Sequence, residues 1–277
     1  MLELNVLIIL IILMFLVSFL YSNLGLGGGM LYVPLMVLIA ITMERLEIIP
    51  VSLFLSFMTQ LPAAYTHYKK DFVKVKLGLL VGVATIPGIV FGVLLGVRTT
   101  DVLAYCMFSM LMFITGTKMV YDIYKKKFDS EHPDKEYSMS RLGAVLLISV
   151  GTGMVAAFFG VGGGIIAVPV LIYILGLYPR RAIGTSALMI VVTSSVAFIC
   201  YALLSLGSFD MAGITFRKVP PINFDLALIL GGVVLIGAYL GSSWGLKSLR
   251  TKSIQIIFVI IIFIVGVQLL LKSLGYI

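Results

Sequence analysis

The sequence is poor in charge. Only 12% of its 277 residues are charged, whereas 61% are hydrophobic and the mean hydropathy is +1.16. A soluble globular domain typically carries about 25% charged residues, so the shortage excludes that class and indicates an integral membrane protein. At about 20 residues for each crossing, the chain has room for roughly eight to ten transmembrane segments and hardly any for a separate soluble domain.

Cysteine and histidine are scarcer still, with two of each. Cys106 and Cys200 stand alone in apolar runs and form no CxxC pair, which favours a packing role over a disulfide or a metal site. The histidines, His67 and His132, belong to no HExxH motif, and GxSxG and P-loop motifs are absent as well. We therefore predict no catalytic residue, no metal site and no cofactor, which means that the protein is not an enzyme.

Acidic residues are fewer than basic ones, 12 against 20, for a net charge of +8. Basic loops are the ordinary topology signal of a membrane protein, so this excess does not indicate a nucleic-acid partner. The carboxylates Glu44, Glu47, Asp101, Asp122 and Asp225 all stand at the ends of expected helices. Proton-driven and cation-driven transporters often bury a carboxylate. Its absence leaves a uniporter or a channel-like path open.

What the chain has is glycine, in a pattern that occurs twice. The segment GLGGGMLYVP (25–34) matches GVGGGIIAVP (160–169) at an offset of 135, with six of ten positions identical. Later glycines repeat at an offset of 149, and FITG (113–116) matches FIVG (263–266) at an offset of 150. Such self-similarity indicates a duplicated unit. We predict a first membrane repeat over 1–123, a charged linker over 124–141, and a second repeat over 142–277.

Each copy contains an opening helix, the glycine break, a short apolar segment and three full helices. The expected segments are 4–23, 30–41, 47–66, 77–95 and 102–121 in the first copy, and 142–159, 165–177, 182–205, 224–246 and 253–271 in the second. The short segments, at about 12 residues, are too short to cross a membrane comfortably. Opening helix and short segment therefore form either a re-entrant hairpin or two tilted crossings. The expected fold class is all-α and polytopic.

The basic residues predict the orientation. If the linker 124–141 is cytoplasmic, 15 of the 20 basic residues lie on the cytoplasmic side and both termini lie outside. The loop after the short segment is then outside in the first copy and inside in the second. The two copies become inverted repeats in the cell membrane, the arrangement of secondary transporters that alternate access around a central site.

The glycine breaks are the strongest candidates for that site. Backbone without helical hydrogen bonds cannot face lipid, and glycine lets both the chain turn and a ligand approach the main chain. Because each short segment starts at the glycines, its free N–H groups and positive dipole end point into the break. We predict an anion site formed by Gly25, Gly27, Gly28, Gly29, Gly160, Gly162, Gly163 and Gly164. The alternative is close helix packing, which we prefer for Gly88, Gly92, Gly96 and their partners.

Polar residues within the full helices extend the candidate site. Thr59 and Gln60 correspond to Ser194 and Ser195 at the offset of 135, and both pairs lie near the middle of their helices. Neutral hydrogen-bonding groups suit an oxyanion that must bind and be released. Interhelical hydrogen bonding is the alternative interpretation. The GTS sequence at 184–186 is expected to cap the helix that follows.

Three basic side chains are candidates for gating or coupling. Arg45 and Arg180 are symmetry partners after the short segments, where they could draw anions to each mouth of a pathway or anchor helix ends. His67 has an unperturbed pKa near 6.5, typical of a proton-coupling group. Its place before a lysine-rich loop favours instead a solvated interfacial residue.

The motif GVGGGIIAVPVLI followed by RRAIGTSALMI, with GLGGGMLYVPLMV and THYKKDFV in the first copy, resembles the TauE/SafE family of sulfite and organosulfonate exporters. The resemblance implies a permease for small sulfur-containing oxyanions. Its expected partners are that substrate and the lipid bilayer, and a homo-oligomer is compatible with the sequence. The alternatives are an anion channel or uniporter, and a structural or assembly membrane protein, which would explain glycine packing but not paired breaks.

Overall fold

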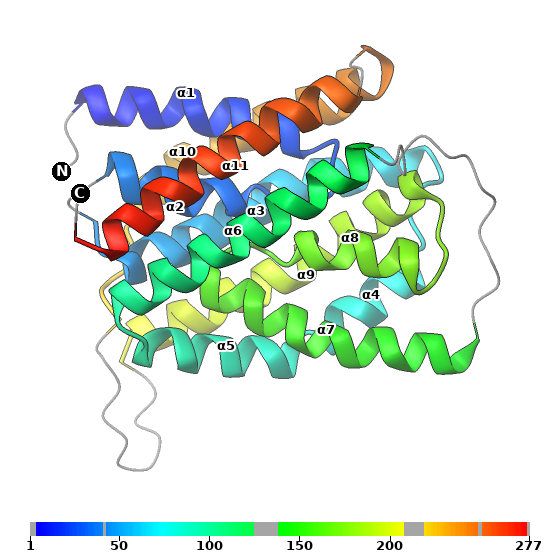
Figure 1. Ribbon diagram of the computed structural model, residues 1–277, viewed down its shortest axis with the longest axis horizontal. Coiled ribbons are helices and arrows are strands. Elements are labelled where there is room, and N and C mark those ends of the chain that lie inside the picture. The colour runs from blue at the N-terminus through cyan, green and yellow to red at the C-terminus, as the bar shows by residue number, and fades with distance from the viewer. Residues whose placement is uncertain (1–3, 41–42, 125–137, 208–218, 249–250, 276–277) are drawn as a thin grey trace.

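The computed structural model describes residues 4–40, 43–124, 138–207, 219–248 and 251–275, and these are all-α (Figure 1). The helices are α1 (Leu4–Tyr21), α2 (Gly29–Ile39), α3 (Arg45–Lys69), α4 (Val75–Ala84), α5 (Ile86–Arg98), α6 (Asp101–Tyr124), α7 (Met139–Phe159), α8 (Gly164–Tyr173), α9 (Pro179–Ser205), α10 (Phe224–Ser248) and α11 (Thr251–Ser273). They lie side by side in one bundle (Figure 1).

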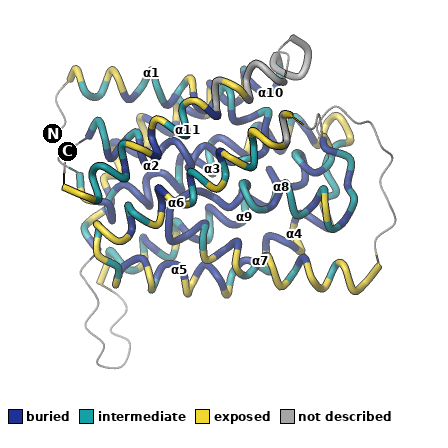
Figure 2. The backbone as a smooth tube through the Cα atoms, viewed as in Figure 1, coloured by how far each residue is buried: buried dark blue, intermediate teal, exposed yellow. Residues whose placement is uncertain are grey.

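Seven segments of the described chain are long and apolar enough to cross a membrane, with α4 and α5 counted as one segment of 24 residues. The last helix, α11, contains a shorter apolar stretch, Val259–Ser273. The exposed residues follow the outer sides of α1, α5, α6 and α7 (Figure 2). They include large apolar side chains such as Phe91, Ile114 and Leu147. The predicted polytopic all-α membrane protein is confirmed.

The two short helices are too short to span. With 11 residues in α2 and 10 in α8, each is about 15–17 Å long, half of a hydrocarbon core of about 30 Å. Each contacts the helix before it, α1 or α7. Each pair forms a hairpin that turns at its glycine break inside the bundle (Figure 1). Both predicted arrangements, re-entry and two tilted crossings, return the chain to its starting side as these hairpins do, and the choice between them stays a prediction.

Several predicted boundaries differ from the structure. Helices α6 and α7 extend into the predicted linker from both sides, to Tyr124 and from Met139. Most of the linker, 125–137, lies outside the described residues. The segment expected over 77–95 is divided at Thr85, because Pro87 in the following turn has no N–H to donate. At the division, Thr85 Oγ1 and the Thr85 N–H both donate to Gly82 O, at 2.6 and 3.2 Å. The second copy also has about 14 residues more than the first between its matching helices, which we place around 206–221, and most of these, 208–218, lie outside the described residues.

Helices α5 and α7 pack backbone against backbone. A Cβ atom on Gly88 would collide with the carbonyl oxygen of Val150, and one on Gly92 with that of Met154. Only residues without a side chain allow such an approach. The packing role predicted for these glycines is confirmed.

The same contact recurs between α10 and α1. A Cβ atom on Gly237 would lie 2.8 Å from Phe15 O, and one on Gly241 would collide with Phe19 O. These glycines are 149 residues after Gly88 and Gly92, and Phe15 is 135 residues before Val150. Each half of the chain therefore packs its opening helix on the glycine face of the other half.

Candidate functional site

Both glycine breaks need left-handed backbone. Gly25 and Gly27 have φ of 60° and 70°, and Gly160, Gly162 and Gly163 have φ of 73°, 79° and 89°. Other residues adopt this region only with strain, so the motif is required for the turn itself. Gly160 also ends α7 in the left-handed conformation common after helices.

The two breaks lie against each other. A Cβ atom on Gly29 would collide with Gly160 O, and one on Gly164 would lie 2.5 Å from the carbonyl carbon of Leu26. The same atom on Gly29 would lie 2.8 Å from Ser56 Oγ on α3. The structure thus brings together the glycines predicted from both copies. No side chain fits between the two breaks, and Ser56 is beside them.

Serine side chains from the long helices hold the first glycine of each break. Ser52 Oγ on α3 donates to Gly160 O at 2.8 Å, and Ser186 Oγ on α9 donates to Gly25 O at 2.8 Å. Each bond joins the long helix of one half to the break of the other. Sequence analysis missed Ser52 and misassigned Ser186. The expectation that GTS caps a helix is wrong, because α9 begins earlier, at Pro179.

The N-termini of α2 and α8 carry unsatisfied donors. Their N-cap residues, Gly28 and Gly163, provide no side-chain cap. Among the described residues, the N–H groups of Gly29 and Gly164 donate to no backbone carbonyl. Two helix N-termini, each equivalent to about half a positive charge, therefore face each other across the breaks. The buried polar residues of the described chain include no carboxylate. This electrostatic arrangement favours an anion.

Two polar side chains near the breaks lack partners. Ser56 and Gln60 are 0% exposed, and Ser56 Oγ and both polar atoms of the Gln60 amide form no hydrogen bond within the described chain. A buried polar group left unsatisfied costs about 1–3 kcal/mol. Ser56 faces the break at Gly29, and Gln60 follows one turn later on the same face of α3. Their arrangement can supply hydroxyl and amide donors to a ligand.

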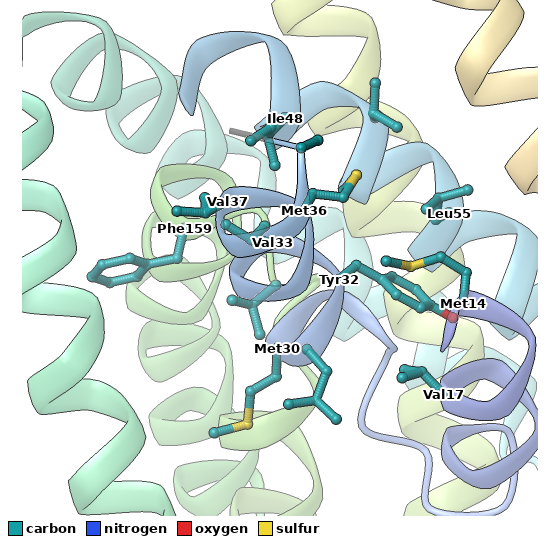
Figure 3. Packing of buried hydrophobic residues seen from close by; sticks show 14 of the residues in the cluster. Met14, Val17, Met30, Tyr32, Val33, Met36, Val37, Ile48, Leu55 and Phe159 are labelled. Atoms are coloured by element: carbon teal, nitrogen blue, oxygen red, sulfur yellow. The ribbon is translucent and has the colours of Figure 1, made fainter. Parts of the chain in front are cut away.

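Thr59, by contrast, is satisfied. Its Oγ1 donates to Leu55 O at 2.8 Å, so the Tyr32 hydroxyl, 2.7 Å away, donates to Thr59. Figure 3 shows the Tyr32 side chain extending from α2 towards α1, beside Met14. A Cβ atom on Gly28 would collide with the Tyr32 ring. This contact explains a glycine at a position where φ is an ordinary −66°.

Ser194 and Ser195 form hydrogen bonds within α9. Ser194 Oγ donates to Ile190 O, and Ser195 Oγ donates to Val192 O at 2.9 Å. Of the four polar positions predicted as a symmetric set, Gln60 is the one without a partner in the described chain. The two halves do not provide equal polar groups.

The symmetric pair of arginines has two different environments. Arg45 is 3% exposed, its Nε lies 3.1 Å from Asp101 Oδ1, and it donates to two carbonyls of the α5–α6 turn, those of Gly96 and Thr99. It thus anchors the C-terminal end of α5, where a cation is favourable. Arg180 is exposed and lies over the ring of Phe72.

His67 is buried. Its exposed fraction is 1%, and both ring nitrogens lack a hydrogen-bond partner within the described residues. The backbone of Ser22, at the end of α1, lies near the ring without hydrogen-bonding geometry. On the other side, a Cβ atom placed on Gly184 of α9 would lie 3.1 Å from the Cβ atom of His67. The prediction of a solvated interfacial histidine is wrong, because α1 and α9 cover this end of α3.

The chain is an all-α bundle of apolar helices, and it buries two facing helix N-termini with neutral polar side chains beside them. This arrangement is typical of membrane transporters. The comparison of sequences agrees. The chain belongs to the TauE/SafE family: the profile described as "Sulfite exporter TauE/SafE" matches residues 10–273.

Individual relatives carry the same general description. The chain is 27% identical over 270 residues to a "Probable membrane transporter protein" of Methanocaldococcus jannaschii, covering 95% of each chain. It is 23% identical over 283 residues to a "Probable membrane transporter protein" of Bacillus subtilis, covering 96% of this chain and 98% of the relative. No solved structure matches the chain.

Proposed function

We propose that the protein is a secondary transporter that exports a small oxyanion, sulfite or an organosulfonate. The observation that carries the proposal is the meeting of two uncapped helix N-termini at packed glycine breaks, beside the unpartnered Ser56 and Gln60. The family description supplies the substrate class, since it names sulfite export.

The chemistry of the site suits this substrate. A sulfite or sulfonate group presents three oxygens, each of which accepts hydrogen bonds from more than one direction. Backbone N–H groups, the Ser56 hydroxyl and the Gln60 amide are all neutral donors. An anion held by neutral donors and helix dipoles is bound without a salt bridge. Its release then requires no separation from a full opposite charge.

We further propose that the two halves are inverted repeats that alternate access. Two features support the proposal: the equivalent glycine contacts between the halves, and the exchanged bonds from Ser52 to Gly160 and from Ser186 to Gly25. The breaks are packed too closely for a side chain, so an anion can pass only when the hairpins separate. With the linker 124–141 cytoplasmic, both termini lie outside, and the start of α1 and the end of α11 are at the same end of the bundle (Figure 1).

A uniporter or channel-like path is the second candidate. It is favoured by one observation, the lack of a buried carboxylate in the described part of the chain. Cation-coupled transporters commonly carry such a group.

The proposed substrate class can be tested with a thermal-shift screen of the purified protein. Sulfite, sulfate, thiosulfate, sulfoacetate and taurine are compared with acetate. A ligand at 100 times its Kd stabilises the folded state by about 2.7 kcal/mol. We expect sulfite or a sulfonate to raise the melting temperature and acetate to leave it unchanged. Failure of every sulfur oxyanion to stabilise the protein would contradict the proposal.

A further inference from the structure

One face of α3 carries a buried polar stripe. It consists of four polar residues and one alanine at spacings of three and four residues, which places them on the same side of the helix: Ser52, Ser56, Gln60, Ala63 and His67. Each is at most 1% exposed. At 1.5 Å per residue, the stripe is about 22 Å long. It starts at the glycine breaks, where Ser52 donates to Gly160 and Ser56 faces Gly29.

The stripe contains three of the side chains whose polar atoms lack partners in the described chain. These are Ser56, Gln60 and His67. Two other polar side chains of α3 are bonded: Thr59 bonds with Tyr32, and Thr66 Oγ1 lies 3.2 Å from Ser242 Oγ. Outside the stripe, Nη1 of Arg45 at the start of α3 also has no partner among the described residues. Five buried side-chain atoms without a partner in the described chain therefore lie on one face of one helix, while Asn23, Arg45 and Ser109 contribute one such atom each elsewhere. Each of the three side chains has a neutral donor to offer.

The other half of the protein has no equivalent stripe. The corresponding positions on α9, at the offset of 135, are Ala187, Val191, Ser195, Phe198 and Ala202. Four of these are apolar, and Ser195 donates to Val192 within its own helix. The stripe is a property of the first half alone.

The stripe leads to a defined end of the bundle. His67 lies two residues before the C-terminal end of α3 and is covered by the end of α1 at Ser22 and the start of α9 at Gly184. Figure 1 shows this end of α3 on the side where α6 ends and α7 begins. We call it the linker side, because the chain enters the predicted linker at Tyr124 and leaves it at Met139.

We propose that Ser56, Gln60 and His67 form the path along which the oxyanion moves between the glycine breaks and the linker side. The anion exchanges hydrogen bonds from one donor to the next, and His67 is its last contact. The path on the opposite side lacks such contacts, so the route through the protein is polar on one side only. This inference rests on the proposed transport of an oxyanion.

Flux measurements on single variants test the path. We expect His67→Leu to lower sulfite flux into proteoliposomes roughly 2- to 12-fold, the equivalent of one lost hydrogen bond. The same variant should still show the thermal shift caused by sulfite, because His67 lies about 16 Å along the helix from Ser56. His67→Gln, which keeps a donor, should restore most of the flux. Ser149→Ala is the control, because the buried Ser149 hydroxyl donates to Val145 O within α7, and it should transport like the wild type. Wild-type flux in His67→Leu would overturn the path.

Cysteine labelling provides a second test that does not depend on His67. In a background with Cys106→Ala and Cys200→Ala, Ala63→Cys should react with a membrane-impermeant thiol reagent added on the linker side only. Ala197→Cys, equally buried on α9, should react from neither side. Unreactive Ala63→Cys in a protein that transports sulfite would overturn the path and leave the proposed function intact. Lack of sulfite binding and flux in the wild type would instead remove the proposed function.

Discussion

Gln60 and Thr59 are neighbours on α3 and equally buried, but their hydrogen bonding is opposite. Thr59 is bonded to Tyr32 and Leu55, and Gln60 is bonded to nothing in the described chain. An unpaired buried amide lowers the free energy of unfolding, so Gln60 does not stabilise the fold, and we infer that it has a functional role.

We therefore predict opposite effects of two substitutions. Gln60→Leu should raise the free energy of unfolding by about 1 kcal/mol or leave it unchanged, because it removes an unsatisfied group. The same variant should weaken sulfite binding roughly 2- to 12-fold, the loss of one hydrogen bond. Thr59→Val should lower the free energy of unfolding instead. Melting temperatures with and without sulfite measure both quantities. A Gln60→Leu variant that is less stable but binds normally would refute the assignment.

The glycines at the helix starts give a second residue-scale prediction. Gly29→Ala and Gly164→Ala each place a methyl group against backbone of the other break. Overpacking of this kind costs about 1–3 kcal/mol. Gly151→Ala on α7 has nothing within 4 Å of the new Cβ, so it should stabilise by up to about 1 kcal/mol. Unfolding in detergent compares the three. Equal stability of all three variants would mean that the breaks are not packed together.

Residue-scale prediction from sequence depended on repetition. The break glycines stood out because consecutive glycines occur twice at one offset. Ser52, Ser56 and Ser186 were missed, since a serine in an apolar run is common and its meaning depends on which helix lies opposite. The burial of His67 could not be predicted for the same reason: the covering residues belong to α1 and α9, distant in sequence.

At the scale of elements, the sequence specified most helices because their lengths and glycine punctuation are characteristic. It left open whether the short segments re-enter or cross, and the lengths of α2 and α8, about half of a hydrocarbon core, favour re-entry. The break at Thr85 was missed because proline does not always interrupt a membrane helix, and Pro50 and Pro62 lie inside the continuous α3. Which helices pair could not be predicted, since glycine spacing indicates close packing but not the partner.

The equivalent helix pairs predict equivalent responses. Gly92→Ala should disturb the contact of α5 with α7, and Gly241→Ala that of α10 with α1, each by about 1–3 kcal/mol. Gly232→Ala, with nothing within 4 Å of its Cβ, is the control and should not destabilise. Thermal unfolding of the purified variants measures the effect. A large loss in one of the pair and none in the other would argue against equivalent packing of the halves.

At the scale of the whole molecule, the orientation in the membrane was predicted from the distribution of basic residues among the loops. That distribution can be counted in the sequence without knowing which helices pack together. Inversion of the halves is testable with single cysteines in the background without Cys106 and Cys200. Glu44→Cys and Arg180→Cys stand after the two short helices and are exposed. We expect an impermeant reagent to label Glu44→Cys from outside intact cells and Arg180→Cys only from the cytoplasm. Labelling of both from one side would show that the repeats are parallel.

Counterflow in proteoliposomes is the most direct test of an oxyanion carried at the paired breaks. Vesicles containing purified protein are loaded with unlabelled sulfite and diluted into a trace of labelled sulfite. A carrier that alternates access should accumulate label transiently above the outside concentration, which a channel cannot do. The double variant Ser56→Ala, Gln60→Leu should lose this accumulation while remaining folded, and Ser149→Ala on α7 should keep it. Wild-type counterflow in the double variant, or no counterflow of any sulfur oxyanion by the wild-type protein, would contradict the account.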